Sequence, residues 1–263
     1  MTKRFCLKGE VYVMKKNKII KTPKEPVIYI VMIVVLMITG IIYLGIDKCK
    51  IECEIKAKNK LALLEKNSQK QNKKISKTVI LDAGHGSMDS GSISMNGVYE
   101  KDIALSLTLK IKEYLDMQGV KTILTRNSDE ILFTSEEEDL SRRIETGVQN
   151  KGDYFISIHL NSSEYNDGVK GFEIYTDFND LQSYEMAETV LKKMDDLNYT
   201  ENRGLKDTNE TPLYIVNHNP ISSLLIECGF ISNDEDFNKL NNEEFQYHLA
   251  QNISKGIMEI FDE

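Results

Sequence analysis

Residues 78–91 read TVILDAGHGSMDSG, and the rest of the chain is organised around this stretch. Its first four residues form a short apolar run rich in β-branched side chains, which is typical of a buried strand. The run breaks into a glycine-rich turn that leaves His85 between two glycines. In open α/β sheets, ligands and catalytic groups collect at the carboxyl ends of strands. We therefore predict that His85 lies at a functional edge of a sheet.

The residues after this stretch alternate between helix-like and strand-like patterns. Apolar residues at intervals of four predict a helix that ends at Gly119: Ile103, Leu107, Ile111 and Leu115. Ser135 precedes three glutamates, which predicts the N-cap of a second helix. The buried face of that second helix is expected to hold Leu140, Ile144 and Val148.

Further strands are expected at 120–125, 154–158, 171–175 and 224–226, a short apolar run at 213–216, and two more helices at 186–197 and 245–257. Alternation of this kind indicates an α/β protein. We predict a single three-layer domain at 78–263, with a largely parallel central sheet and helices on both faces.

The net charge of −8 conceals a strong difference between the two parts of the chain. Residues 1–77 carry 18 Lys and Arg against 6 Asp and Glu, so the rest holds 15 basic and 35 acidic side chains. The acidic C-terminal part lacks the basic surface that nucleic-acid-binding proteins present, so no nucleic-acid partner is expected.

The basic N-terminal part contains 20 consecutive uncharged residues, VIYIVMIVVLMITGIIYLGI at 27–46. This length is enough to cross a bilayer core as a helix. A cleaved secretory signal is the alternative, but the run is long for a signal core and no small-x-small cleavage site follows it. We expect one transmembrane anchor at 27–46, a basic tail at 1–26 and a lysine-rich stalk at 47–77. Met14 is a second candidate start. Six lysines from Lys8 to Lys24 and six from Lys48 to Lys66 leave the orientation of the run open.

The four cysteines do not predict a metal site, because no pair is spaced as CxxC. Cys228 together with His159 would suggest a thiol hydrolase. Because strand side chains alternate between faces, Cys228 should point away from whatever Glu227 faces, and we expect it to be a small buried residue.

Two of the four histidines, His85 and His159, directly follow strand-like runs. The carboxyl ends of parallel strands share one edge of a sheet, so we expect the two imidazoles to lie together. Glu100, at the start of the first helix, and Glu227, at the end of the strand 224–226, fit the same edge. Glu100 could instead be a carboxylate favoured only by the helix dipole. A near-buried Glu227 would be costly unless it is paired or bound to a metal.

Two imidazoles and one carboxylate form the ligand set of a catalytic zinc site with one open position. A second carboxylate beside the attacking water would accept and donate protons. The chain contains no HExxH motif, so these groups come from separate elements. The sequence therefore predicts one zinc ion per chain.

Four segments resemble, in order, the motifs of the zinc-dependent N-acetylmuramoyl-L-alanine amidases of the Amidase_3 class: VILDAGHGSMDSGSISMNGVYEKDIAL, TRNSDE, FISIHLNSS and LIECGFISNDED. The resemblance covers residues 78–261. It implies that zinc is held by His85, Glu100 and His159, and that Glu227 is the catalytic glutamate. Two departures are small, with Ala83 where a proline is common and Cys228 at a variable position. The arginine of the family's Leu-Arg-x-x-x-x-Asn helix corresponds to Arg142 or Arg143, and its asparagine is displaced.

The resemblance implies hydrolysis of the amide between N-acetylmuramic acid and L-alanine in peptidoglycan. Because peptidoglycan lies outside the cytoplasm, we expect a single-pass protein of the cell membrane with the domain 78–263 on the extracytoplasmic side. A bare domain behind an anchor also resembles the spore-cortex, germination-type members, which implies an accessory lipoprotein and leaves open whether the substrate is vegetative wall or spore cortex. Asn161 and Arg203 are expected at the substrate cleft. Asn161 would either polarise the scissile carbonyl or only brace the loop after His159.

Two other functions are compatible with the same motifs. One is a non-catalytic peptidoglycan-binding scaffold of the same fold, and the other is a zinc hydrolase of a different amide. The presence of both histidines and both glutamates argues against the scaffold.

Overall fold

The computed structural model describes residues 3–8, 10–15, 18–21, 32–33, 35–37, 77–129, 135–164 and 168–261. The chain divides into two compact units, Met1–Lys70 and Gln71–Glu263, and this division falls within the predicted stalk. The first unit contains a three-stranded antiparallel sheet of β1 (Lys3–Leu7), β2 (Glu10–Lys15) and β3 (Lys18–Lys21). The predicted basic tail therefore includes a small β-meander.

The predicted anchor at 27–46 lies mostly outside the described residues. Within the parts of the chain that the structure does describe, no helix has the length and apolar character needed to cross a bilayer.

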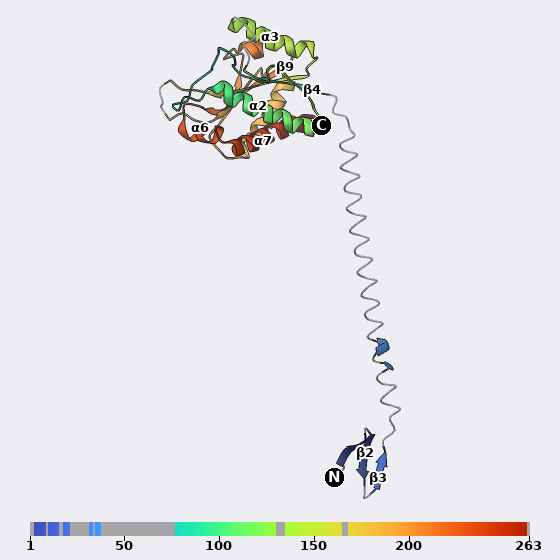
Figure 1. The fold of residues 1–263 in the computed structure, drawn as a ribbon. Coiled ribbons are helices and arrows are strands. Elements are labelled where there is room, and N and C mark those ends of the chain that lie inside the picture. Colours follow the sequence, from blue (N-terminus) through green and yellow to red (C-terminus); the bar gives the residue numbers. More distant parts are fainter. Residues whose placement is uncertain are drawn as a thin grey trace. The chain divides into compact units, whose positions relative to one another are not determined.

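The second unit is built on a six-stranded sheet with the strand order β5-β4-β6-β9-β7-β8 (Figure 1). The strands are β4 (Thr78–Ala83), β5 (Lys121–Leu124), β6 (Tyr154–Asn161), β7 (Phe172–Thr176), β8 (Asn202–Asp207) and β9 (Ser222–Phe230). The first four strands in this order are parallel, whereas β7 is antiparallel to β9 and β8 is parallel to β7.

The sheet is largely parallel, as predicted, because four of its five strand pairs are parallel, but the antiparallel pair of β7 and β9 makes it mixed. Only ten residues, 162–171, connect β6 to β7. A parallel crossover requires a dozen or more residues, so this short connection forces β7 to run in the opposite direction. The helix that follows β7 then returns the chain to β8 in the direction of β7.

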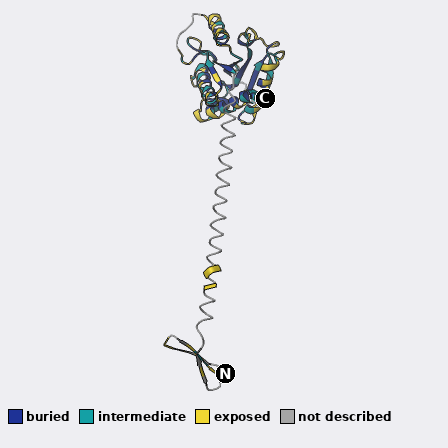
Figure 2. Cartoon of the chain, turned by 90° about the vertical axis from the view of Figure 1, so that its right-hand side faces the viewer, coloured by how far each residue is buried: buried dark blue, intermediate teal, exposed yellow. Residues whose placement is uncertain are grey.

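Helices cover both faces of this sheet, as predicted. One face carries α2 (Glu100–Met117), α4 (Leu181–Asp195), α6 (Asp234–Leu240) and α7 (Glu243–Phe261), and the other carries α3 (Glu136–Gln149) and α5 (Tyr214–Asn217). Alternate side chains of β4 enter two separate cores. Val79 and Leu81 belong to the large cluster under α2, α4 and α7, while Ile80 belongs to the small cluster under α3 and α5. Figure 2 shows the buried residues concentrated in this unit.

The apolar stripe predicted for the first helix is confirmed, since α2 buries Ile103, Leu107, Ile111 and Leu115. Ser135 caps α3 as predicted, with its hydroxyl accepting the backbone N–H of Glu138 at 3.2 Å.

The buried face predicted for α3 is confirmed only in part. Leu140 and Ile144 are half-buried and pack against the small cluster, whereas Val148 is 48% exposed. The buried residues of this helix are Asp139, Arg143 and Gly147. The helix is turned so that a charged side chain reaches the sheet.

Arg143 is the charged side chain that sets this rotation, and it is only 5% exposed. Its Nη1 donates to Asp82 Oδ1 at 2.9 Å, and its Nη2 donates to Asp139 Oδ2 at 2.6 Å. Burial alone would raise the pKa of Asp82, but Arg143 and the hydroxyls of Ser157 and Thr125 hold it below the ordinary value of 3.8. The carboxylate of Asp82 therefore remains ionised inside the unit.

We expect the substitution Arg143→Met to lower the free energy of unfolding by about 3–5 kcal/mol, because it leaves two buried carboxylates without their counter-charge. Arg142→Met is the matched control, since Arg142 is the exposed neighbour on the same helix. An exposed arginine contributes within about 1 kcal/mol. Urea unfolding followed by circular dichroism measures both values. Equal losses for the two variants would contradict the assignment of Arg143 as the structural arginine.

Candidate metal centre and active site

The sheet places His159 directly beside the turn that carries His85. Ala83, the last residue of β4, pairs with Ile158 of β6, and the N–H of Gly84 donates to the carbonyl of Ile158 at 3.0 Å. A Cβ atom on Gly84 would lie 2.4 Å from the ring of His159. Only glycine fits at this position, because the imidazole of His159 occupies the space above it.

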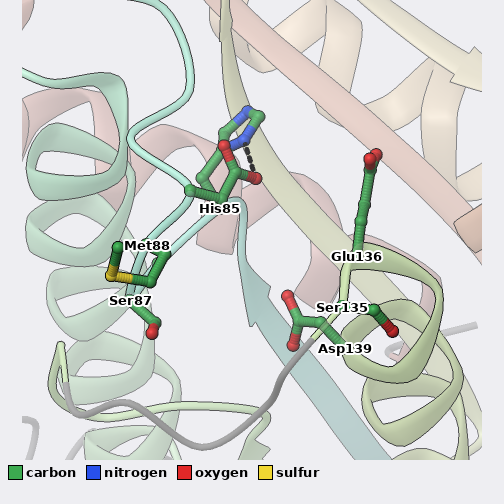
Figure 3. Close-up of a pocket in the computed structure, with 8 residues that line it drawn as sticks. His85, Ser87, Met88, Ser135, Glu136 and Asp139 are labelled. Atoms are coloured by element: carbon green, nitrogen blue, oxygen red, sulfur yellow. Dashed lines mark hydrogen bonds and ion pairs between the residues drawn. The ribbon is translucent and has the colours of Figure 1, made fainter.

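His85 adopts a left-handed backbone conformation, with a φ of 58°. Its Nδ1 hydrogen-bonds Asp89 Oδ2 at 2.7 Å, which is the contact drawn in Figure 3. The other ring nitrogen, Nε2, lies 3.1 Å from Glu100 Oε1. Asp89 thus orients the ring, and Nε2 is the nitrogen that faces Glu100.

Glu100 is the first residue of α2 and is 2% exposed. Its Oε1 lies 3.1 Å from His159 Nδ1 and accepts the N–H of Leu160 at 3.0 Å. Its Oε2 accepts the N–H of Ser92 at 2.9 Å. Each carboxylate oxygen is therefore held in place by a backbone donor, and Oε1 also contacts both imidazoles.

The electrostatics of this cluster couple the three groups. Burial alone would raise the pKa of Glu100, but His159 and His85 lower it well below its ordinary range. Burial alone would lower the pKa of His85, but Asp89 and Glu100 raise it to about 10. The negative charge on Glu100 and Asp89 thus favours a cation at this point.

One donor atom from each of His85, Glu100 and His159 can be chosen so that all three lie within 4.8 Å of one another. A tetrahedral zinc ion with bonds of 2.0–2.2 Å would place its donors about 3.4 Å apart. The two separations from Glu100 Oε1, both 3.1 Å, are close to that value. Among the residues that the structure describes, this is the one cluster of at least three such donors. The donor set and its spacing fit zinc.

Glu227 lies on β9, directly beside this cluster. Its Cα pairs with that of His159 on β6 and with that of Glu173 on β7, so the three residues occupy neighbouring positions across three strands. Its Oε2 is buried and has no hydrogen-bond partner within the described part of the chain. Burial, Glu100 and Glu173 all raise its pKa well above the ordinary value.

Glu173 is a site residue that the sequence reasoning missed. It is 3% exposed, and it accepts hydrogen bonds from Asn161 Nδ2 at 2.8 Å, the Tyr175 hydroxyl at 3.0 Å and Arg203 Nε at 2.9 Å. A glutamate inside the apolar strand GFEIYT is the same signal that singled out Glu227. The two residues predicted for the cleft, Asn161 and Arg203, thus both bind Glu173.

Cys228 is buried, as predicted, and belongs to the large core cluster under α2, α4 and α7. Leu225, three residues earlier on the same strand, belongs to the small cluster on the opposite face of the sheet. Burial also raises the pKa of the Cys228 thiol, which disfavours the thiolate that a nucleophile requires.

Two cavities adjoin His85. The larger, about 420 Å³, is lined by residues 85–89 and by Ser135, Glu136 and Asp139 at the start of α3; Figure 3 shows these residues around it. The second, about 240 Å³, reaches His159 and is bounded by Tyr214 and Pro212. Asn161 and Arg203 line neither of them. Open space beside the cluster therefore lies towards α3 and α5.

Comparison with known proteins agrees with this geometry. A family model described as N-acetylmuramoyl-L-alanine amidase matches residues 79–259. The uncharacterized protein YqiI of Bacillus subtilis is 33% identical over 189 residues, which cover 71% of this chain and 86% of that protein. The germination-specific N-acetylmuramoyl-L-alanine amidase of Bacillus subtilis is 30% identical over 199 residues, with coverages of 71% and 81%.

A solved structure, the CwlD amidase of Clostridioides difficile in complex with the GerS lipoprotein, matches with a TM-score of 0.65 at 32% identity. The match covers 71% of this chain and 99% of that chain. The chain therefore belongs to the N-acetylmuramoyl-L-alanine amidase family, as its motifs predicted.

Proposed function

We propose that this protein is a zinc-dependent N-acetylmuramoyl-L-alanine amidase. It hydrolyses the amide between the lactyl group of N-acetylmuramic acid and the L-alanine of the stem peptide in peptidoglycan. The observation that carries the proposal is the buried, unpartnered Oε2 of Glu227 on the strand beside the cluster of His85, Glu100 and His159. Membership of the amidase family supports the choice of substrate.

In this proposal His85, Glu100 and His159 hold one zinc ion per chain. When bound, zinc polarises the scissile carbonyl and lowers the pKa of the attacking water towards neutrality. The carboxylate of Asp89 accepts a hydrogen bond from the Nδ1–H of His85, which leaves the lone pair on Nε2 for the metal. The amides of Ser92 and Leu160 hold the two oxygens of Glu100 in a fixed orientation.

Glu227 then acts as the proton carrier. It takes a proton from the attacking water and delivers it to the nitrogen of the leaving amine. The raised pKa of Glu227 makes its carboxylate a stronger proton acceptor in the first step than a carboxylate with the ordinary value of 4.5. Asn161 and Arg203 support the cleft through Glu173, the cross-strand neighbour of Glu227.

We further propose that residues 27–46 anchor the chain in the cell membrane and that the catalytic unit is extracytoplasmic, where peptidoglycan lies. The 20 uncharged residues of this run support the anchor. Likeness to a germination-specific amidase and to CwlD in complex with the GerS lipoprotein supports a role in the spore cortex, with an accessory lipoprotein as partner. Action on the vegetative wall would use the same chemistry.

The substitution Glu227→Gln tests the proton carrier. Because the amide cannot take up the proton, we expect kcat to fall by about 10²–10⁴-fold, the usual contribution of general acid–base catalysis. The melting temperature and zinc content should not fall, because the variant removes a buried carboxylate that lacks a partner. Mass spectrometry of stem peptides with a free L-alanine terminus, released from purified peptidoglycan, measures the rate. Glu235→Gln, at an exposed ion pair with Lys170, is the control that keeps full activity. A Glu227→Gln variant as active as wild type would refute the proposed role.

Metal dependence is tested by chelation and by His159→Asn. We expect chelation of zinc from the full-length chain to abolish hydrolysis and added Zn²⁺ to restore it. His159→Asn should lose both bound zinc, measured by atomic absorption, and activity, because only two of the three donors remain. His248→Asn, an exposed histidine on α7, is the control. Hydrolysis that survives complete metal removal would contradict the proposal.

Membrane topology is tested with the full-length chain carrying a different epitope tag at each terminus. Protease added to intact protoplasts should remove the C-terminal tag and spare the N-terminal tag, and both should be lost after permeabilisation. Loss of the N-terminal tag from the membrane fraction before protease treatment would indicate a cleaved signal. A protected C-terminal tag would exclude the extracytoplasmic orientation.

A further inference from the structure

The segment TRNSD at 125–129 follows β5 and has no part in the proposed chemistry. It nevertheless contacts the backbone segments that carry His85 and Glu100. Arg126 is its central residue and is 7% exposed. Its Nε donates to the carbonyl of Ala83 at 2.9 Å. Its Nη2 donates to the carbonyls of Gly84 and Lys101, each at 2.8 Å.

These carbonyls belong to the two segments that carry His85 and Glu100. Gly84 precedes His85, and Lys101 follows Glu100 at the start of α2. One nitrogen of Arg126 therefore bridges the neighbours of two proposed ligands. Because the guanidinium is planar and rigid, its donors impose a fixed separation that a flexible ammonium group would not.

Asp129 joins the same two segments a second time. Its Oδ1 accepts the N–H of Ser87 at 2.7 Å, and its Oδ2 accepts Lys101 Nζ at 2.6 Å. Lys101 Nζ also donates to the carbonyl of Ser87 at 2.9 Å. The turn after His85 is thus tied to Lys101, the residue that follows Glu100 in the first turn of α2.

The turn needs this support because its backbone is strained. His85 and Ser87 have φ values of 58° and 56°, a backbone conformation that residues other than glycine rarely adopt. Gly86 lies between them with a φ of 130°, and a Cβ there would lie 2.9 Å from Cδ and Nε of Arg126. The side chain of Arg126 therefore packs directly against the middle of the strained turn.

We propose that Arg126, assisted by Asp129, is a positioning residue that sets the spacing between His85 and Glu100 and thereby sets the affinity for the metal ion. The inference rests on the proposed function, because it takes His85 and Glu100 as ligands. Neither Arg126 nor Asp129 belongs to the donor cluster. They act through Gly84 and Ser87, on either side of His85, and through Lys101, which follows Glu100.

The test measures the zinc dissociation constant of the full-length chain, purified in detergent, by competition with a chelator. Arg126→Lys keeps the charge but loses the planar fork, and we expect its dissociation constant to rise about 10–100-fold, as for other residues that orient metal ligands. Asp129→Ala, at a side chain that is 41% exposed, should raise it by a smaller factor of at least about threefold.

Thr189→Val is the control for general loss of stability. Thr189 donates to the carbonyl of Gly256 at 3.0 Å between α4 and α7, away from the cluster. Its zinc affinity should remain within about twofold of wild type, since distant sites act independently. The visible absorption spectrum of the cobalt-substituted protein gives a second readout, and Arg126→Lys should change it whereas Thr189→Val should not.

The inference is overturned if folded Arg126→Lys and Asp129→Ala bind zinc as tightly as wild type. It is also overturned if Thr189→Val weakens zinc binding as much as they do, because the effect would then be one of stability. If Arg126→Lys does not fold, Asp129→Ala alone decides. Wild-type protein that binds no zinc would overturn the proposed function, and this inference with it, so the two failures are distinct.

Discussion

Two buried arginines hold three consecutive backbone carbonyls, those of Ala83, Gly84 and His85, and the rest of the site depends on this interaction. Arg126 takes the first two and Arg143 takes the first and third. The chain leaves the sheet at this point, so these buried carbonyls lose their strand partners and need other donors. The guanidinium groups supply these donors and at the same time hold His85 in its left-handed conformation.

Four acids lie in the site or directly beside it, namely Asp82, Glu100, Glu173 and Glu227, and one of them differs from the others. Asp82 is neutralised by Arg143, Glu100 lies between two imidazoles, and Glu173 accepts from Asn161, Tyr175 and Arg203. Glu227 differs from the other three because its buried Oε2 has no partner in the described residues; away from the cluster, Oδ1 of Asp236 is also without one. Such a group destabilises the fold, and residues of this kind are commonly kept where activity needs them. The contrast among the four acids supports proton transfer by Glu227.

The antiparallel direction of β7 also determines which residues lie beside Glu227. Because β7 runs antiparallel to β9, its register places Glu173 opposite Glu227 and brings Arg203 of the adjacent strand β8 to the same carboxylate. The charged row formed by His159, Glu227 and Glu173 thus crosses parallel and antiparallel pairs of one sheet. The parallel pair brings His159 to Glu227, and the antiparallel pair brings Glu173 to it.

The sequence by itself determined most helices and strands of the unit Gln71–Glu263 and the cluster of His85, Glu100 and His159, but it did not indicate β8 or α6. Hydrophobic periodicity is a local property, and the carboxyl ends of neighbouring parallel strands must share an edge, so both could be predicted from the order of residues. Only the tertiary structure decided which face of α3 is buried, which way β7 runs and what Asn161 and Arg203 contact. Arg143 and Asp82 are 61 positions apart, and no local pattern indicates that a charged residue will be buried by so distant a partner. Burial of charge depends on pairing across the fold, and that pairing exists only once the elements have packed.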